Sequence, residues 1–297
     1  MAKDTAVVLS CHGTVEKVED IPAFVNNIRR GRPAPEEVIH EVTDRFEQIG
    51  GSPLMRISHG QAEALEARLG IPCRAAARLW HPYPPEVLKP LHEAGIRRVL
   101  SLPLAPQSVQ IYNKVVAEAA GELDMEMLEA PSYGEEPALV GAFADAITEA
   151  HGRFGTHERL AIVLSAHSLP KRVIAMGDPY ETQFKAMAAA VTAELDRRGV
   201  TRDETRIAFQ SQGMGGGDWL GPDLDETFER LREAGIERLL MAPIGFVAEH
   251  VETLYDIDVE AKDKALGMGF SQLERMPPMD TRPGFIDALE AVARRLL

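Results

Sequence analysis

Short apolar runs rich in β-branched residues alternate along this chain with longer, helix-like segments. Residues 5–11 (TAVVLSC) precede His12, and a similar run, residues 160–166 (LAIVLSA), precedes His167. Short apolar runs that end in a polar turn are typical of buried strands. We therefore predict a strand at each place, with a histidine at its carboxyl end.

A second pair of similar segments indicates an internal repeat. Residues 93–103 (EAGIRRVLSLP) match residues 233–243 (EAGIERLLMAP), and in each a helix is predicted to stop at a glycine just before a strand. Two further helix-like segments, 52–70 and 178–199, each open at a residue followed by proline and end near a glycine. The repetition favours two lobes of related design, and chance similarity of short αβ units is the alternative.

The pattern thus predicts an α/β fold with two lobes, residues 1–150 and residues 151–297, each a mostly parallel sheet flanked by helices. The first lobe carries an inserted segment between His12 and Pro53. Because α/β sheets bind ligands beyond the carboxyl ends of their strands, two such lobes predict a cleft with His12 and His167 at its edges.

Composition narrows the class of protein. The 297 residues are 45% hydrophobic and 26% charged, which is typical of a folded globular protein. The net charge of −14 disfavours nucleic acid as a partner, because an acidic surface repels phosphate backbones. Two cysteines, Cys11 and Cys73, are too few for a four-cysteine zinc site or an iron–sulfur cluster and fit a reducing compartment. No apolar stretch approaches the ~20 residues of a transmembrane helix, and the first apolar run is too short for a signal peptide, so we expect a cytoplasmic protein.

His167 is the first candidate for chemistry. A neutral imidazole at the carboxyl edge of a sheet can accept a proton or bind a borderline metal ion. A structural histidine, held by hydrogen bonds in the turn, is the alternative interpretation of the same position.

The second candidate is an acidic row in residues 246–260, which we predict to be a helix. Glu252, Asp256 and Glu260 recur every four residues and would line one stripe, with Glu249 within it. Like charges at this spacing repel, and no basic residue of the segment offsets them. The row would suit metal delivery or proton removal, and a solvated face is the alternative.

Two further features are ambiguous. Arg29, Arg30 and Arg32 cluster in the inserted segment, with Arg45 further on, and guanidinium groups suit carboxylates or phosphates. A solvated helix end is the alternative, and it is the more frequent explanation of such a run. The glycine-rich residues 213–217 lack the lysine of a phosphate loop and predict a turn that positions Trp219, as a core anchor or as an aromatic wall.

Several motifs in fixed order resemble the ferrochelatase family, whose members insert ferrous iron into a porphyrin in haem biosynthesis. They are SAHSLP (165–170), GDPY (177–180), WLGP (219–222) and HVETLY (250–255). Residues 28–33 and 44–54 also resemble the family, especially its short bacterial members. The resemblance covers nearly the whole chain and implies two Rossmann-like, chelatase-like lobes with a porphyrin cleft between them.

The resemblance also implies roles for individual residues. His167 and Glu252 match the catalytic and metal-binding pair, Asp256 and Glu260 match an acidic path leading from it, and residues 16–50 match a lip over the cleft. The positions that match the porphyrin site are Ile28, Arg29, Arg45, Phe46, Ser52, Tyr112 and Trp219.

His12 departs from the family, since relatives carry tyrosine or methionine at this position. As the counterpart of His167 in the repeat, it is a candidate axial ligand of iron, and we expect purified protein to retain the haem product. A histidine held by hydrogen bonds in the turn is the alternative interpretation. Iron is a substrate in this scheme, no cofactor is required, and we expect a monomer because the chain lacks the extra carboxyl-terminal element of some relatives.

Other functions stay open at this point. A non-catalytic haem or porphyrin carrier would need the cleft but not the proton acceptor. A chelatase for another tetrapyrrole, such as sirohydrochlorin, is a nearer alternative, although such relatives lack the combination of WLGP and the arginine-bearing lip. A solute-binding receptor is disfavoured because we find no export signal. The residues leave the choice between protoporphyrin IX and coproporphyrin III open.

Overall fold

The computed structural model describes residues 4–29, 31–155, 159–213 and 217–297. The chain divides into two compact units. The first contains the chain up to Ala138 together with Ala248–Val251 and Asp280–Leu297, and the second contains Leu139–Val247 and Glu252–Met279. The sequence analysis predicted a single boundary after residue 150, whereas in the structure the final helix, Pro283–Leu296, belongs to the first unit.

A four-stranded parallel sheet in the order β2-β1-β3-β4 forms the centre of the first unit. Its strands are β1 (Thr5–Cys11), β2 (Cys73–Ala77), β3 (Arg98–Pro103) and β4 (Glu126–Glu129). Every residue of β1 is buried, which explains why this inner strand is an almost uninterrupted apolar run.

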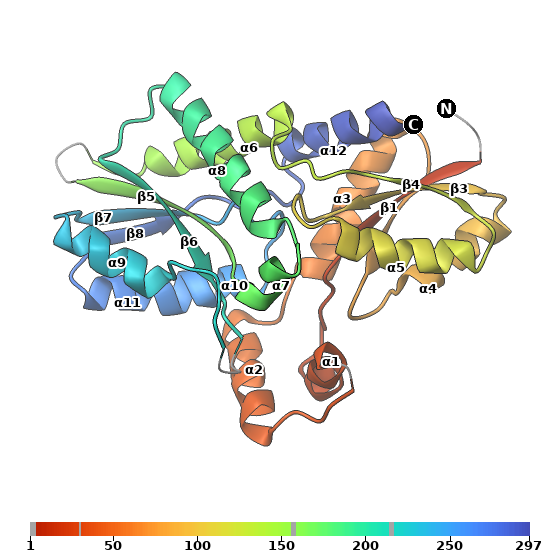
Figure 1. Cartoon of the computed structure of the whole chain (residues 1–297), viewed down its shortest axis with the longest axis horizontal. Coiled ribbons are helices and arrows are strands. Elements are labelled where there is room, and N and C mark those ends of the chain that lie inside the picture. The colour runs from red at the N-terminus through yellow and green to blue at the C-terminus, as the bar shows by residue number, and fades with distance from the viewer. Residues whose placement is uncertain (1–3, 30, 156–158, 214–216) are drawn as a thin grey trace. The chain divides into compact units, whose positions relative to one another are not determined.

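Helices cover both faces of this sheet (Figure 1). They are α3 (Leu54–Leu69), α4 (Pro84–Glu93), α5 (Gln110–Gly121) and α12 (Pro283–Leu296). Leu88 of α4 and Val116 of α5 pack with Val8 and Val99 of the strands in one apolar cluster. On the other face α12 packs against α3. Arg68 of α3 forms ion pairs with Asp287 and Glu290, which lie one turn apart on α12.

The inserted segment of the first unit is largely helical. It contains a 3-10 turn (Val18–Asp20), α1 (Ile21–Ile28) and α2 (Glu36–Ile49). These elements and the loop before them bury an apolar cluster, made of Val15, Ile21, Phe24, Val25 and Phe46, against which Leu79, Trp80 and Val251 from elsewhere in the chain also pack. The segment therefore has a local core that holds α1 against α2.

The second unit repeats the same design. Its four strands are also all parallel, in the order β6-β5-β7-β8. They are β5 (Leu160–His167), β6 (Glu204–Gln210), β7 (Arg238–Ala242) and β8 (Gln272–Arg275). The equivalent strand orders agree with the internal repeat in the sequence, and the α/β fold with parallel sheets is confirmed.

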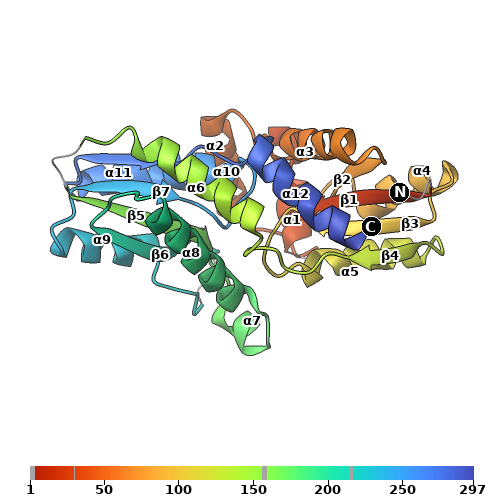
Figure 2. The same cartoon turned by 90° about the horizontal axis from the view of Figure 1, so that it is seen from above.

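Seven helical segments belong to or enter the described part of this second unit. They are α6 (Pro137–His151), α7 (Lys171–Ala175), α8 (Tyr180–Arg197), α9 (Leu224–Glu233), α10 (Val251–Leu254), a π-helix (Asp256–Ala261) and α11 (Lys262–Gly267). Phe228 of α9 and Ala265 of α11 share a cluster with strand residues, and Phe184 of α8 meets Phe209 of β6 edge to face. Figures 1 and 2 show α6 and α8 on one side of this sheet, opposite α9 and α11.

Helix ends follow the sequence signals closely. Gly95 and Gly235, the predicted stops, follow α4 and α9 with left-handed φ values of +94° and +78°, a conformation that glycine adopts without strain. No helix in the described ranges is long and apolar enough to cross a membrane.

The predicted continuous helix over residues 246–260 is wrong. Helical structure starts only at Val251, lasts one turn, and resumes as a π-helix at Asp256. In the non-helical residues before Val251, the backbone N–H of Glu249 donates to the carboxylate of Asp280 (2.9 Å). In the π segment, the N–H of Glu260 donates to the carbonyl of Tyr255, five residues back (3.0 Å).

Candidate active site

His167 is the last residue of β5, an inner strand of the second unit's sheet. Its carbonyl accepts a hydrogen bond from the hydroxyl of Tyr180 at the start of α8 (3.0 Å). The hydroxyl of the next residue, Ser168, donates to the carbonyl of Leu220 (2.9 Å). The backbone on both sides of the imidazole is therefore fixed, and the ring lies at the carboxyl edge of the sheet, as predicted.

Glu252, on the one-turn helix α10, meets this imidazole directly. His167 Nδ1 and Glu252 Oε2 lie 2.8 Å apart, which is a hydrogen bond between an imidazole N–H and a carboxylate. About a third of each side chain is exposed. The structure thus brings together the two residues that the sequence singled out as a pair, although they are far apart in the chain.

The pair changes the proton affinity of the imidazole. Burial alone would lower the pKa of His167, because a low-dielectric environment disfavours the imidazolium. The charge and hydrogen bond of Glu252, with the charge of Asp256 in addition, outweigh burial and raise the pKa of His167 above its usual value. A protonated His167 is therefore stabilised at this place.

Asp256 lies near the pair, but Glu260 is an exposed residue. Asp256 is buried and its carboxylate accepts a hydrogen bond from the hydroxyl of Ser211, the residue that follows β6. Glu260 lies on the surface at the far end of the same π-helix. Of the predicted acidic row, Glu252 and Asp256 therefore lie with His167, and Glu249 lies outside the helix.

In the first unit, His12 and Arg78 lie at the carboxyl edge of the sheet. His12 follows β1 and is exposed, and Arg78 follows β2. The N–H of Arg78 donates to the carbonyl of Cys11 (3.0 Å), and the N–H of Leu79 to that of His12 (2.9 Å), so the two strand ends are joined.

Arg78 is a candidate that the sequence analysis missed. Its guanidinium carbon lies 5.8 Å from the ring centroid of Tyr112 on α5, a cation–π distance. Its Nε is buried with no hydrogen-bond acceptor among the described residues. Arg78 directly follows a short apolar strand, much as His12 follows β1 and His167 ends β5. This position in the sequence was the signal that could have revealed it.

The lip residues differ in how far they face solvent. Ile28 and Arg29 are exposed at the end of α1, whereas Arg45 on α2 pairs with Glu41 (2.7 Å). Phe46 lies in the apolar cluster of α1 and α2, with only 2% of its surface exposed, so its ring contributes to packing rather than to an open surface of this unit. Arg30 lies outside the described residues.

Ser52 and Trp219 also lie at specific places. Ser52 is buried, and its hydroxyl has no hydrogen-bond partner in the part of the chain that the structure describes. Trp219 is only half-buried and pairs with Pro170 in an isolated β-bridge, so it is not a core anchor. Most of the glycine-rich turn before it, residues 214–216, lies outside the described residues.

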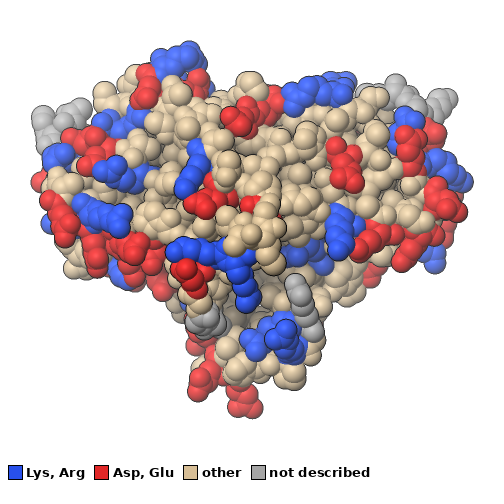
Figure 3. Space-filling view, viewed as in Figure 1, with Lys and Arg blue, Asp and Glu red and all other residues tan. Residues whose placement is uncertain are grey.

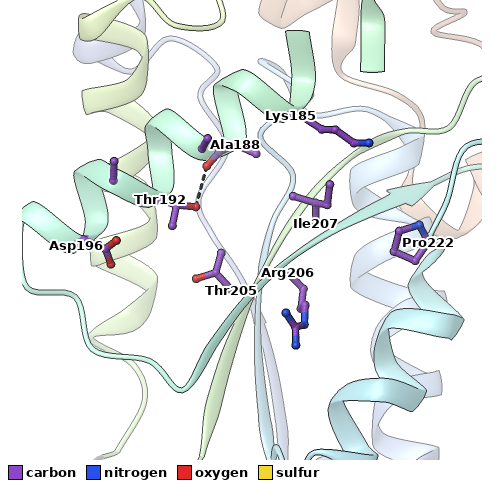
Figure 4. A pocket seen from close by; sticks show the side chains of 10 residues that line it. Lys185, Ala188, Thr192, Asp196, Thr205, Arg206, Ile207 and Pro222 are labelled. Atoms are coloured by element: carbon purple, nitrogen blue, oxygen red, sulfur yellow. Dashed lines mark hydrogen bonds between the residues drawn. The ribbon is translucent and has the colours of Figure 1, made fainter. Parts of the chain in front are cut away.

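A groove in the second unit lies apart from these groups. It has a volume of about 540 Å³ and runs between α8 and β6 (Figure 4). The residues that line it are Lys185, Ala188, Ala189, Thr192, Ala193, Asp196, Thr205, Arg206, Ile207 and Pro222. None of the predicted site residues is among them. On the face drawn in Figure 3, acidic and basic side chains are interspersed, so the net charge of −14 does not produce one continuous acidic field there.

The fold defines the class of protein. SirB from Bacillus subtilis with Fe3+ aligns over 98% of this chain and 94% of its own, with a TM-score of 0.62 at 13% identity, which shows the fold alone. The chain thus has the two-lobed α/β fold that SirB has.

Sequence similarity then shows the family. The sequence profile described as ferrochelatase matches residues 4–297. The ferrochelatase of Acidobacterium capsulatum is 36% identical over 99% of this chain and 95% of its own length. The coproporphyrin III ferrochelatase of Bacillus subtilis is 34% identical over 99% of this chain and 98% of its own. The chain belongs to the ferrochelatase family, and its function is the insertion of Fe²⁺ into a porphyrin in haem biosynthesis. A non-catalytic carrier and a chelatase for another tetrapyrrole are not favoured.

Proposed function

We propose that His167 and Glu252 carry the metal-insertion step. The observation that supports this is the 2.8 Å contact between His167 Nδ1 and the Glu252 carboxylate. Because Nδ1–H donates to the carboxylate, Nε2 is the ring atom left with a lone pair. A porphyrin must release two pyrrole protons as it gains Fe²⁺, and Nε2 can accept one of them. Glu252 then stabilises the imidazolium that forms.

The same pair suits brief contact with the incoming substrate metal. One imidazole and one carboxylate are an incomplete ligand set for a divalent ion, which therefore remains free to leave for the porphyrin. Asp256 would add negative charge beside the pair, and exposed Glu260 would be the outer end of the acidic path. In this proposal the protein needs no cofactor and no iron–sulfur cluster.

Substrate binding is proposed to rest on cationic and polar groups of the first unit. Arg29, Arg45 and Arg78 can bind the carboxylates of a porphyrin, since guanidinium groups match carboxylate geometry. The buried hydroxyl of Ser52 and the ring of Tyr112 would complete these contacts. We further infer that the protein acts as a monomer in the cytoplasm, where its two buried free thiols, Cys11 and Cys73, would stay reduced.

Anaerobic Fe²⁺ insertion, followed by absorption spectroscopy with coproporphyrin III and with protoporphyrin IX, tests the proposal. We expect His167→Ala and Glu252→Ala to lose metallation with both porphyrins while the circular dichroism spectrum is unchanged. His151→Ala is the matched control, because His151 lies in the same unit but bonds the carbonyl of Thr201. Normal turnover in the first two variants would refute the assignment, and porphyrin binding without metallation in the wild type would favour a carrier.

A further inference from the structure

Gln210 is a buried amide at the centre of the candidate site. It is the last residue of β6, only 3% of its surface is exposed, and it is the register partner of His167 on β5. A buried amide needs hydrogen-bond partners for both its oxygen and its nitrogen. The sequence analysis assigned no role to this residue.

Three hydrogen bonds of Gln210 connect the two sides of the candidate pair. Its carbonyl accepts from the N–H of Ser168, the residue after His167 (2.7 Å). Its side-chain Oε1 accepts from the hydroxyl of Ser165 on β5 (2.7 Å). Its Nε2 donates to the backbone carbonyl of Glu252 (2.8 Å). One residue thus holds the backbone beside both members of the pair.

The helix that carries Glu252 is irregular. α10 has four residues, and after Tyr255 the chain continues as the π-helix from Asp256. The Glu252 carbonyl therefore lies where α-helical bonding gives way to π-helical bonding, and it accepts a bond from outside the helix. The bond from Gln210 therefore fixes the height of α10 relative to the end of β5, and with it the position of the Glu252 carboxylate.

We propose that Gln210 is a positioning residue of the metal-insertion site, which sets the geometry of His167 and Glu252 without touching either substrate. This inference rests on the proposed roles of His167 and Glu252. The relay Ser165–Gln210–Glu252 requires that the amide nitrogen face α10 and that Ser165 hold the amide oxygen in that orientation. Ser165 therefore selects the productive rotamer of the glutamine.

The test compares Gln210→Met with Gln61→Met. Methionine keeps the length of the side chain but removes its hydrogen bonds to Ser165 and Glu252 and the longer contact with the Ser211 hydroxyl (3.5 Å). Gln61 is the matched control, since it is fully buried and its Nε2 donates to the carbonyl of Asp280 (2.9 Å) in the other unit. We expect Gln210→Met to reduce kcat for Fe²⁺ insertion about ten- to a hundredfold, because a 1 Å misplacement can cost that much. Porphyrin affinity, measured by fluorescence titration, should stay within twofold of wild type, and Gln61→Met should lose stability but not kcat.

Two further variants keep the proposal testable if Gln210→Met does not fold. Gln210→Glu retains the acceptor for Ser165 but has an oxygen in place of the donor to Glu252, so it should lose kcat as Gln210→Met does. Ser165→Ala should lower kcat several-fold in the wild-type background and leave it unchanged in the Gln210→Glu background.

The outcomes separate this inference from the proposed function. Near-normal kcat in folded Gln210→Met or Gln210→Glu, together with inactive His167→Ala and Glu252→Ala, would overturn the role of Gln210 only. An equal effect of Ser165→Ala in both backgrounds would also overturn it. Full activity of His167→Ala and Glu252→Ala would instead refute the roles of the pair, whatever Gln210 does.

Discussion

Gly245→Ala tests whether close packing behind His167 sets the geometry of the pair. An alanine Cβ at this position would overlap Cβ of Ala166, the residue before His167, and would lie 2.7 Å from its Cα. Carbon atoms pack at about 3.5–4.0 Å, so the two backbones must separate by roughly 1 Å. Ala166 is fully buried within an inner strand and has no flexible end that could yield.

The expected effects concern both stability and turnover. Overpacking of a core typically costs about 1–3 kcal/mol of unfolding free energy. A shift of β5 by about 1 Å also moves His167 relative to Glu252, which can reduce turnover up to about a hundredfold. The matched control is Gly141→Ala in α6, where the added Cβ would meet only Arg198 Nη2 at 3.8 Å. In a helix interior this change should stabilise the protein by about 0.5–1 kcal/mol.

Two measurements check the predicted changes in stability and turnover: urea unfolding and anaerobic Fe²⁺ insertion. Both are made at a temperature where both variants are folded. Gly245→Ala should lower the unfolding midpoint and kcat together, while Gly141→Ala raises the midpoint and leaves kcat unchanged. Equal stability and equal kcat for Gly245→Ala and wild type would refute the argument that this contact is tight. A loss of stability without a loss of kcat would show that the strain does not reach His167.

Three other predictions follow from the site and its surroundings. Glu252 holds the pKa of His167 above its usual value, and only the neutral imidazole accepts a proton, so wild-type activity should rise with pH through that raised pKa. In a pH–rate profile, Glu252→Gln should move this rise in activity to lower pH. An unmoved rise would contradict the coupling between the two side chains. Phe46→Ala should cost about 3–5 kcal/mol in urea unfolding, because the ring is buried, and an unchanged midpoint would count against its packing role. His12→Ala should lose the haem absorption that we expect for purified wild type, whereas identical spectra would exclude an iron contact.

The sequence predicted the strands and helix ends of the two sheets, because local patterns of apolar residues and glycines determine where these elements begin and end. Apolar runs and glycine stops located β1, β5 and the ends of α4 and α9, and placed both His12 and His167 at strand ends. The pairing of His167 with Glu252 came from motif order rather than from any local pattern, and the structure confirms that the two side chains meet.

The sequence failed where tertiary contacts decide the conformation. The prediction of one continuous helix over 246–260 was wrong: residues 246–250 are not helical, and Glu249 there bonds Asp280, which is distant in the chain. Arg78 and Gln210 were missed because their importance depends on which strands are neighbours. Gln210 is an ordinary polar residue in the sequence, and only the register of β6 on β5 places it beside His167.

The return of α12 to the first unit affects how the protein is made. Ribosomes release a chain from its amino terminus, and domains generally fold as they emerge. The first unit lacks α12, which packs on α3, until residues 283–296 have been translated. Most of the second unit is one uninterrupted stretch, Leu139–Val247, and its remainder, Glu252–Met279, precedes α12. All residues of the half that carries His167 and Glu252 therefore leave the ribosome before α12 completes the half that begins the chain.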